Sequence, residues 1–212
     1  MAKKCTGTND LYDNVEFCPG EVTLPGMKEF FFFIRRNKIV TWPTLPMNSA
    51  ESLEKNPVYD GDFVLAADAK WKRVDLIPNE SEPQSERTGA YGSYHFNNKA
   101  SLVIPGTGPK VTGLINELIN DDVVMALPQR DGRFRIFGNK DFKLDVNPTQ
   151  KWGKATTDSN NTTLEVTDEN RSASPFYDGK IEADDGNYSG KTGELIVDSA
   201  SKPASTSTGS GS

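Results

Sequence analysis

Five large apolar residues stand side by side at positions 30–34, four phenylalanines followed by an isoleucine. Arg35 and Arg36 end the run, which is far shorter than the ~20 apolar residues that span a membrane as a helix. Successive side chains of a β-strand point to opposite faces of the sheet. We therefore expect a strand that is covered on both faces, by the chain's own core or, on one face, by another subunit.

Further β-type segments follow along the chain. Segments rich in β-branched and aromatic residues occur at 21–42, 62–77, 91–104, 123–127, 133–137, 142–146 and 164–181. Arg130-Asp131-Gly132 predicts a tight hairpin, and Asn97-Asn98 predicts another. The alternation slips between Trp71 and Val74, which we interpret as a β-bulge. Many short strands are therefore expected.

One segment has the periodicity of an amphipathic helix. Pro109 follows Thr107-Gly108 and suits the first helical position. An apolar stripe then recurs at i, i+3, i+4, i+7 and i+8, in Val111, Leu114, Ile115, Leu118 and Ile119. A helix this short needs packing against a sheet to be stable. The expected fold is therefore mainly β, a β-sandwich or β-barrel with one flanking amphipathic α-helix.

Composition divides the chain into three parts. Residues 1–20 are polar and predict an N-terminal arm suited to contact with a neighbour, to packing on its own domain, or to fraying. Residues 21–183 predict one β-rich domain, with an extended loop at 43–60 that contains three prolines and a short helical turn near 49–55. Residues 184–212 are rich in Gly, Ser and Thr and predict a flexible tail.

The charge balance argues against a nucleic-acid-binding surface. The net charge is -6 and the isoelectric point is about 4.9. Tight binding of DNA or RNA comes mainly from clustered Lys and Arg, so we expect none. An acidic surface suits a wall past which DNA moves without binding. The N-terminus has no apolar secretory segment, so we expect a soluble protein that is made in the cytoplasm.

The residues that could support catalysis are few. His95 is the single histidine, and we expect it on the solvent side of its strand. Cys5 and Cys18 are the only cysteines; we interpret them as free thiols, with a late disulfide as the alternative. Two thiols are too few ligands for a tetrahedral metal ion. We therefore predict no catalytic residue.

Other motifs give weak signals for ligands. Gly106-Thr107-Gly108-Pro109 resembles a phosphate loop, but no Gly-Lys-Ser/Thr follows, so a turn and a helix start explain it better. Asp158-Ser159-Asn160 and Asp184-Asp185-Gly186 group oxygen donors without the spacing of a calcium loop. They leave a surface cation site as an alternative, but we predict no metal and no cofactor. Trp42, Trp71 and Trp152 either pack in the core or stack on sugars.

Several short motifs carry a resemblance to a known class of protein. They are Gly61-Asp62-Phe63, the segment 70–76, Pro105-Gly106-Thr107, Asp131-Gly132-Arg133 with Gly138-Asn139, the segment 153–169 and the segment 174–179. Across residues 60–183 the chain resembles the tail-tube-like and head-tail connector proteins of tailed bacteriophages, particularly crAss-like gut phages.

The resemblance implies a virion structural protein that is not an enzyme. Its fold would be of the tail-tube type, and its subunits would join their sheets into a hexameric ring whose stacked bore conducts the genome without specific DNA binding. The implied partners are copies of this chain and neighbouring tail, connector or portal proteins, and no membrane span is implied. The location would be the virion, after assembly in the host cytoplasm. Two alternatives stay open: a carbohydrate- or receptor-binding β-module of a phage fibre or cell surface, and a polysaccharide depolymerase.

Overall fold

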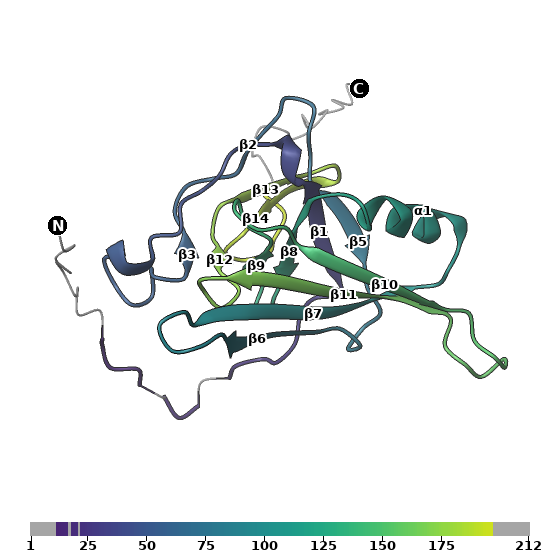
Figure 1. Cartoon of the computed structure of the whole chain (residues 1–212), viewed down its shortest axis with the longest axis horizontal. Helices are drawn as coiled ribbons and strands as arrows, with labels where there is room; N and C mark the ends of the chain where they lie inside the picture. The colour runs from purple at the N-terminus through teal and green to yellow at the C-terminus, as the bar shows by residue number, and fades with distance from the viewer. Residues whose placement is uncertain (1–11, 17, 21, 197–212) are drawn as a thin grey trace, which may run out of the picture.

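The computed structural model describes residues 12–16, 18–20 and 22–196 (Figure 1). Two β-sheets lie face to face, and one α-helix, α1 (Pro109–Leu118), flanks them among the described residues. The sheets do not close into a barrel. The expected mainly β fold with one flanking helix is confirmed, as a sandwich-like arrangement of sheets.

The larger sheet has six strands in the spatial order β3-β12-β9-β8-β1-β5. All its neighbours run antiparallel except β12 and β3, which run parallel. The bounds are β1 (Phe30–Arg35), β3 (Val58–Tyr59), β5 (Lys72–Asp75), β8 (Val123–Pro128), β9 (Phe134–Phe137) and β12 (Phe176–Tyr177).

The smaller sheet has four antiparallel strands in the order β10-β11-β7-β6. Their bounds are β6 (Glu82–Thr88), β7 (His95–Pro105), β10 (Asp145–Lys151) and β11 (Asn161–Asn170). Two strand pairs complete the domain: β2 (Ile39–Thr41) with β4 (Val64–Leu65), and β13 (Lys180–Ala183) with β14 (Gly186–Ser189). Short 3-10 turns occur at Arg36–Lys38 and Met47–Ser49.

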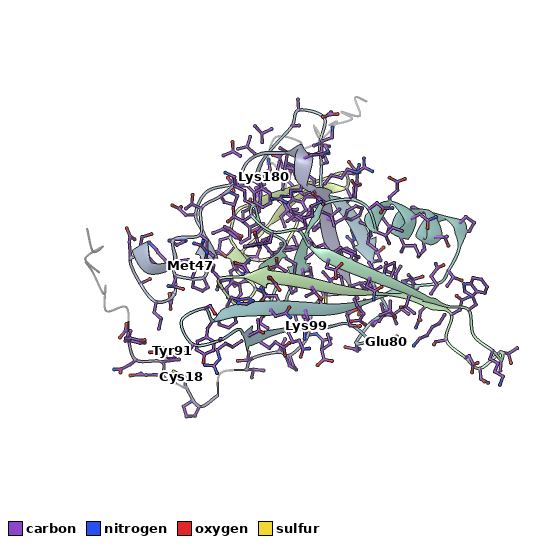
Figure 2. All side chains as sticks on the ribbon, in the orientation of Figure 1. Cys18, Met47, Glu80, Tyr91, Lys99 and Lys180 are labelled. Carbon is purple, nitrogen blue, oxygen red and sulfur yellow. The ribbon has the colours of Figure 1, made fainter. Side chains whose placement is uncertain are left out.

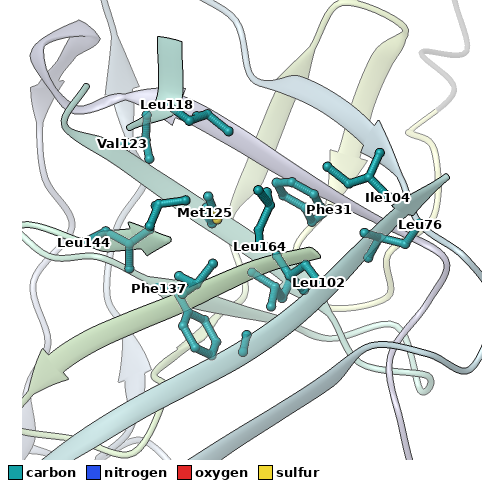
Figure 3. Close-up of a cluster of buried hydrophobic side chains, with 14 of the residues drawn as sticks. Phe31, Leu76, Leu102, Ile104, Leu118, Val123, Met125, Phe137, Leu144 and Leu164 are labelled. Atoms are coloured by element: carbon teal, nitrogen blue, oxygen red, sulfur yellow. The ribbon is translucent and has the colours of Figure 1, made fainter. Parts of the chain in front are cut away.

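The main core fills the space between the two large sheets (Figure 3). Phe31 and Met125 enter it from the six-stranded sheet, and Leu102 and Leu164 enter it from the four-stranded sheet. All four side chains have no exposed surface. Ile115 and Leu118 of α1 pack against the same cluster, which confirms that the helix lies on the sheets.

A second core lies on the opposite face of the six-stranded sheet. Phe32 and Ile34 of β1 pack there with Phe134 and Trp71, while Phe31 and Phe33 belong to the first core. The expectation that the phenylalanine run is covered on both faces is therefore confirmed. The cover on both faces comes from this chain itself.

Two local predictions were wrong, and one strand was not predicted. No bulge is needed at Trp71, because Trp71 faces the second core while Val74 faces the first, and strict alternation explains both. Asn97-Asn98 is not a hairpin, because β7 runs through it without a break. The polar stretch before residue 88 contains β6, an edge strand that has no apolar alternation to reveal it.

The hairpin at Arg130-Asp131-Gly132 is confirmed. Gln129 N–H donates to Arg133 O at 2.8 Å, and Arg133 N–H donates to the Asp131 carboxylate at 3.0 Å. Gly132 has φ +103, and a Cβ there would meet Thr192 O at 2.0 Å. Only glycine therefore fits this turn without displacing the neighbouring chain.

The ends of the domain differ from the expected boundaries. Residues 186–189 form β14, and Tyr188 is buried in the second core, so the folded domain continues past residue 183. At the other end Val22 is 77% exposed and lies outside any strand, so the arm continues past residue 20. Residues 197–212 and the arm before residue 12 lie outside the described residues. Within the described part of the chain, no helix is long and apolar enough to cross a membrane.

Candidate functional site

The histidine and the cysteines were expected to have no catalytic role. His95 begins β7, and its Nδ1 lies 3.2 Å from Ser93 O. Cys18 is an exposed free thiol, and Cys5 lies outside the described residues. Among the residues that the structure describes, no three His, Cys, Asp or Glu side chains gather as metal ligands. The prediction that no catalytic residue exists is left untested by these positions.

The two acidic motifs are engaged in local contacts. The Asp158 carboxylate accepts hydrogen bonds from the N–H groups of Lys154 and Ala155, at 2.7 and 2.9 Å, and these bonds lower its pKa. The Asp185 carboxylate accepts a hydrogen bond from the Tyr188 hydroxyl at 2.8 Å. Asp184 pairs with Lys72.

The Gly106–Pro109 segment joins β7 to α1 and contacts the connection between β10 and β11. Gly106 N–H donates to Asn160 O at 3.1 Å, and the Thr107 hydroxyl donates to the Asn160 side chain at 2.8 Å. Pro109 occupies the first turn of α1. These contacts agree with the interpretation of the segment as a turn and a helix start.

A buried polar network lies at one end of the sandwich, centred on Asp168 of β11. Asp168 has no exposed surface. Its carboxylate accepts hydrogen bonds from the side-chain amides of Asn98, Asn139 and Asn170, each at 3.3 Å. Asn98 also donates to Ser172 O at 3.2 Å. The network joins β7, β11 and the loop after β9.

Burial raises the pKa of Asp168 to about 6, although the amide hydrogen bonds oppose this shift. The carboxylate contacts amides and forms no ion pair with a described residue. We missed this network at the sequence level, although a signal exists. Leu164 and Val166 face the core, and two-residue alternation from them places Asp168 on the inward face as well.

A pocket of about 310 Å³ lies beside this network, between the loop 43–60 and the loop after β9. Trp42, Met47 and Tyr59 contribute to one side, and Asp141 and Phe142 contribute to the other. Met47 is labelled in Figure 2. Trp42 packs edge-on against Phe63, with ring centroids 5.6 Å apart. The Pro-rich loop 43–60 thus forms one wall of this pocket.

The three tryptophans have different environments. Trp71 is 1% exposed and belongs to the second core, as its core-packing interpretation requires. Trp42 is half-buried at the pocket. Trp152 is 77% exposed and directly follows β10, in a connection to β11 that extends beyond the sheets at the right of Figure 1.

The outer face of the four-stranded sheet is polar and mainly acidic. Its outward positions follow from the register, because Ala100, Leu102, Leu164 and Val166 point inward. The Ser101 hydroxyl donates to Glu165 at 2.9 Å across this face, and Lys99, labelled in Figure 2, pairs with Glu86. The outward charged residues are the acids Glu82, Glu86, Asp145, Glu165 and Glu169 and the bases Lys99 and Lys151.

The described part of the N-terminal arm exposes apolar side chains. Val15, Val22 and Leu24 are 86, 77 and 54% exposed. The chain is tied to the domain at Gly26, whose carbonyl accepts from Arg130 N–H at 3.1 Å. A groove of about 500 Å³ begins there, with Met27, Leu127 and Phe137 in its lining.

Comparison of the chain with protein-family models, with curated proteins and with solved structures found no match.

Proposed function

We propose that this chain is a virion structural protein, a subunit of a phage tail tube or head-tail connector ring through which the genome passes. The observation that carries the proposal is the apolar arm. Val15, Val22 and Leu24 are exposed on an extended segment. Exposed apolar surface is characteristic of protein–protein contact sites. The partner is a second copy of the chain.

The position of the described apolar projections supports the proposed ring. The described arm runs along the bottom of Figure 1 from the lower left, and the β10–β11 connection with Trp152 lies at the right. Contacts between different patches of successive copies are heterologous, and they form a closed ring when the rotation between subunits closes. The groove at Gly26, about 500 Å³ in volume, offers a place where a neighbour's apolar residues could pack. The resemblance of the sequence to tail-tube proteins supports a hexamer.

The acidic sheet face supports the role in genome passage. Five carboxylates and two ammonium groups point outward from β6, β7, β10 and β11. Such a face repels a polyanion. A ring that turns this face inward would therefore conduct DNA without binding it.

The experiment measures the mass of the purified full-length chain by multi-angle light scattering over a concentration series. We expect a ring-sized species at high concentration and an annular outline in electron micrographs. Replacing Val22 and Leu24 with serine should shift the equilibrium toward the monomer, because the apolar contact area is lost.

Val40→Ser is the matched control, since Val40 is 67% exposed and lies on β2, away from the arm. It should leave the ring intact. A chain that stays monomeric at millimolar concentration and is absent from native virions would rule out the proposal.

A further inference from the structure

The pocket beside Trp42 combines aromatic walls with polar groups that no other described residue binds. The Tyr59 hydroxyl, the Asp141 carboxylate and the Arg171 guanidinium all belong to residues that line it. Within the described part of the chain, none of these three groups has a hydrogen bond or ion pair. The Tyr59 side chain is 9% exposed, so its ring is largely buried in the pocket wall.

The state of the Tyr59 hydroxyl suits hydrogen bonding to a ligand. Burial raises the pKa of this phenol, and the negative charges of Asp168 and Asp141 raise it further. The phenol therefore keeps its proton over the physiological range. A protonated phenol can both donate and accept a hydrogen bond, so the Tyr59 hydroxyl can bind a ligand hydroxyl in either direction.

The wall that carries Asp141 and Phe142 is held in place from below. The Asn139 side-chain oxygen accepts hydrogen bonds from the N–H groups of Asp141 and Phe142, both at 2.8 Å. Its amide nitrogen donates to Asp168 at 3.3 Å and to Glu169 O at 3.0 Å. The donors and the acceptor of Asn139 are thus used to tie the loop to the buried network. A loop fixed in this way loses little entropy when a ligand binds.

The opposite wall contains a strained residue. Met47 has φ +47, in the left-handed region that residues other than glycine rarely adopt. Its side chain lines the pocket next to Trp42. Backbone strain of this kind occurs preferentially at ligand-binding positions. Met47 therefore provides an indication of a binding site that is independent of the unpartnered polar groups.

We propose that this pocket binds one sugar residue of a glycan. A pyranose has an apolar C–H face that packs on aromatic rings, and Trp42 and Phe142 offer such rings. Its hydroxyls both donate and accept, and Tyr59, Asp141 and Arg171 supply matching groups. The volume of about 310 Å³ lies at the lower end of small-molecule sites and accommodates a single sugar.

The charges at the pocket allow either a neutral or a carboxylated sugar. Arg171 and Lys140 are cationic, and Asp141 is anionic. A carboxylated sugar would gain an ion pair with Arg171, whereas a neutral sugar would use the same group as a hydrogen-bond donor. The shared requirement is a ring with adjacent hydroxyls. A binding panel that contains both neutral and carboxylated sugars distinguishes these two ligands.

The test is binding of the full-length protein to a panel of neutral and uronic-acid oligosaccharides, measured by calorimetry. We expect saturable binding to at least one of them. Tyr59→Phe removes only the hydroxyl, and Asp141→Asn removes only the charge. Each should weaken binding by about tenfold, the effect of one lost hydrogen bond. Trp152→Ala is the control, because this exposed tryptophan lies outside the pocket, and it should not change the affinity.

Methionine methyl groups locate the binding site directly. In protein labelled with ¹³C at the methionine methyls, the added oligosaccharide should shift the Met47 signal and leave the signal of Met125, which is fully buried in the main core. The proposal is overturned if no oligosaccharide of the panel binds. It is also overturned if Tyr59→Phe and Asp141→Asn bind as tightly as the unaltered protein, or if Trp152→Ala abolishes binding.

This proposal and the ring proposal fail separately. A monomer that binds sugars through Tyr59 would overturn the ring and keep the pocket. A ring without sugar affinity would do the reverse.

Discussion

Asp168 is a fully buried carboxyl group, which is either ionised or protonated. Three asparagine amides donate to its carboxylate, and β7, β11 and the loop after β9 meet there. Hydrogen bonds to the ionised form lower a carboxyl pKa, while burial raises it. The effect of burial is the larger one, and the pKa rises to about 6. Stability near this residue should therefore depend on pH.

The sign of this dependence follows from the two pKa values. The folded protein keeps the Asp168 proton up to about pH 6, whereas an unfolded aspartate releases it near pH 4. The folded state thus binds more protons between these values, and its stability falls as pH rises through that window. A shift of about two units corresponds to about 3 kcal/mol.

We expect the free energy of unfolding of the unaltered protein to exceed that of Asp168→Asn by the largest amount at pH 4 and below. This difference should be about 3 kcal/mol smaller at pH 7, because asparagine does not titrate. Urea unfolding at several pH values measures this difference. Glu169→Gln, at an exposed neighbouring position, serves as the control and should show no such change. A difference that grows with pH would mean that the pKa of Asp168 is lowered.

At the scale of elements, α1 shows how a sequence pattern and a packed surface differ. The apolar stripe predicted five inward residues. Ile115 and Leu118 are 8 and 3% exposed, and Val111 and Leu114 pack in part against the core. Ile119 is 51% exposed, because it lies at the C-cap, where the helix ends. Periodicity assigns a residue to a face, and the length of the contact decides whether that residue is buried.

Two alanine substitutions on this helix test the assignment. Ile115→Ala should lower the free energy of unfolding by about 2–4 kcal/mol, because it leaves a cavity in the main core. Ile119→Ala should change it by less than about 1 kcal/mol, because the side chain is half in water already. The measurement is urea unfolding of both variants at one pH. Equal losses would contradict the packing of α1 described above.

At the scale of the whole molecule, charge should influence assembly. The chain carries a net charge of -6, and one sheet face concentrates carboxylates. In the proposed ring, with this face turned inward, these faces approach one another, so like charges repel. Salt screens such repulsion over about 10 Å at 0.1 M.

We therefore expect the ring to form at lower protein concentration as NaCl is raised from 20 to 200 mM. Sedimentation velocity across this series measures the shift. Glu165→Gln with Glu169→Gln should reduce the salt dependence, since both residues point outward from β11. Lys99→Gln, which removes a positive charge from the same face, should increase it. Dissociation of the ring by added salt would instead indicate contacts between opposite charges.

Much of the architecture can be predicted from the sequence. The phenylalanine run of β1 requires a sheet covered on both faces, because adjacent side chains of a strand point to opposite sides. The stripe from Val111 to Leu118 predicts the helix, and Arg130-Asp131-Gly132 predicts the hairpin. These signals are local, since each depends on residues that are close together in the sequence.

Other features are decided by contacts between distant segments. β6 is a strand because it pairs with β7, and its polar sequence gives no apolar alternation. Asn97-Asn98 continues β7 because β11 and β6 bond to it on both sides. The Asp168 network and the Trp42 pocket unite residues from up to 129 positions apart, from Trp42 to Arg171. The sequence by itself determined which faces must be buried, because that depends on local spacing, whereas the tertiary structure alone decided which polar groups meet, because that depends on how the sheets stack.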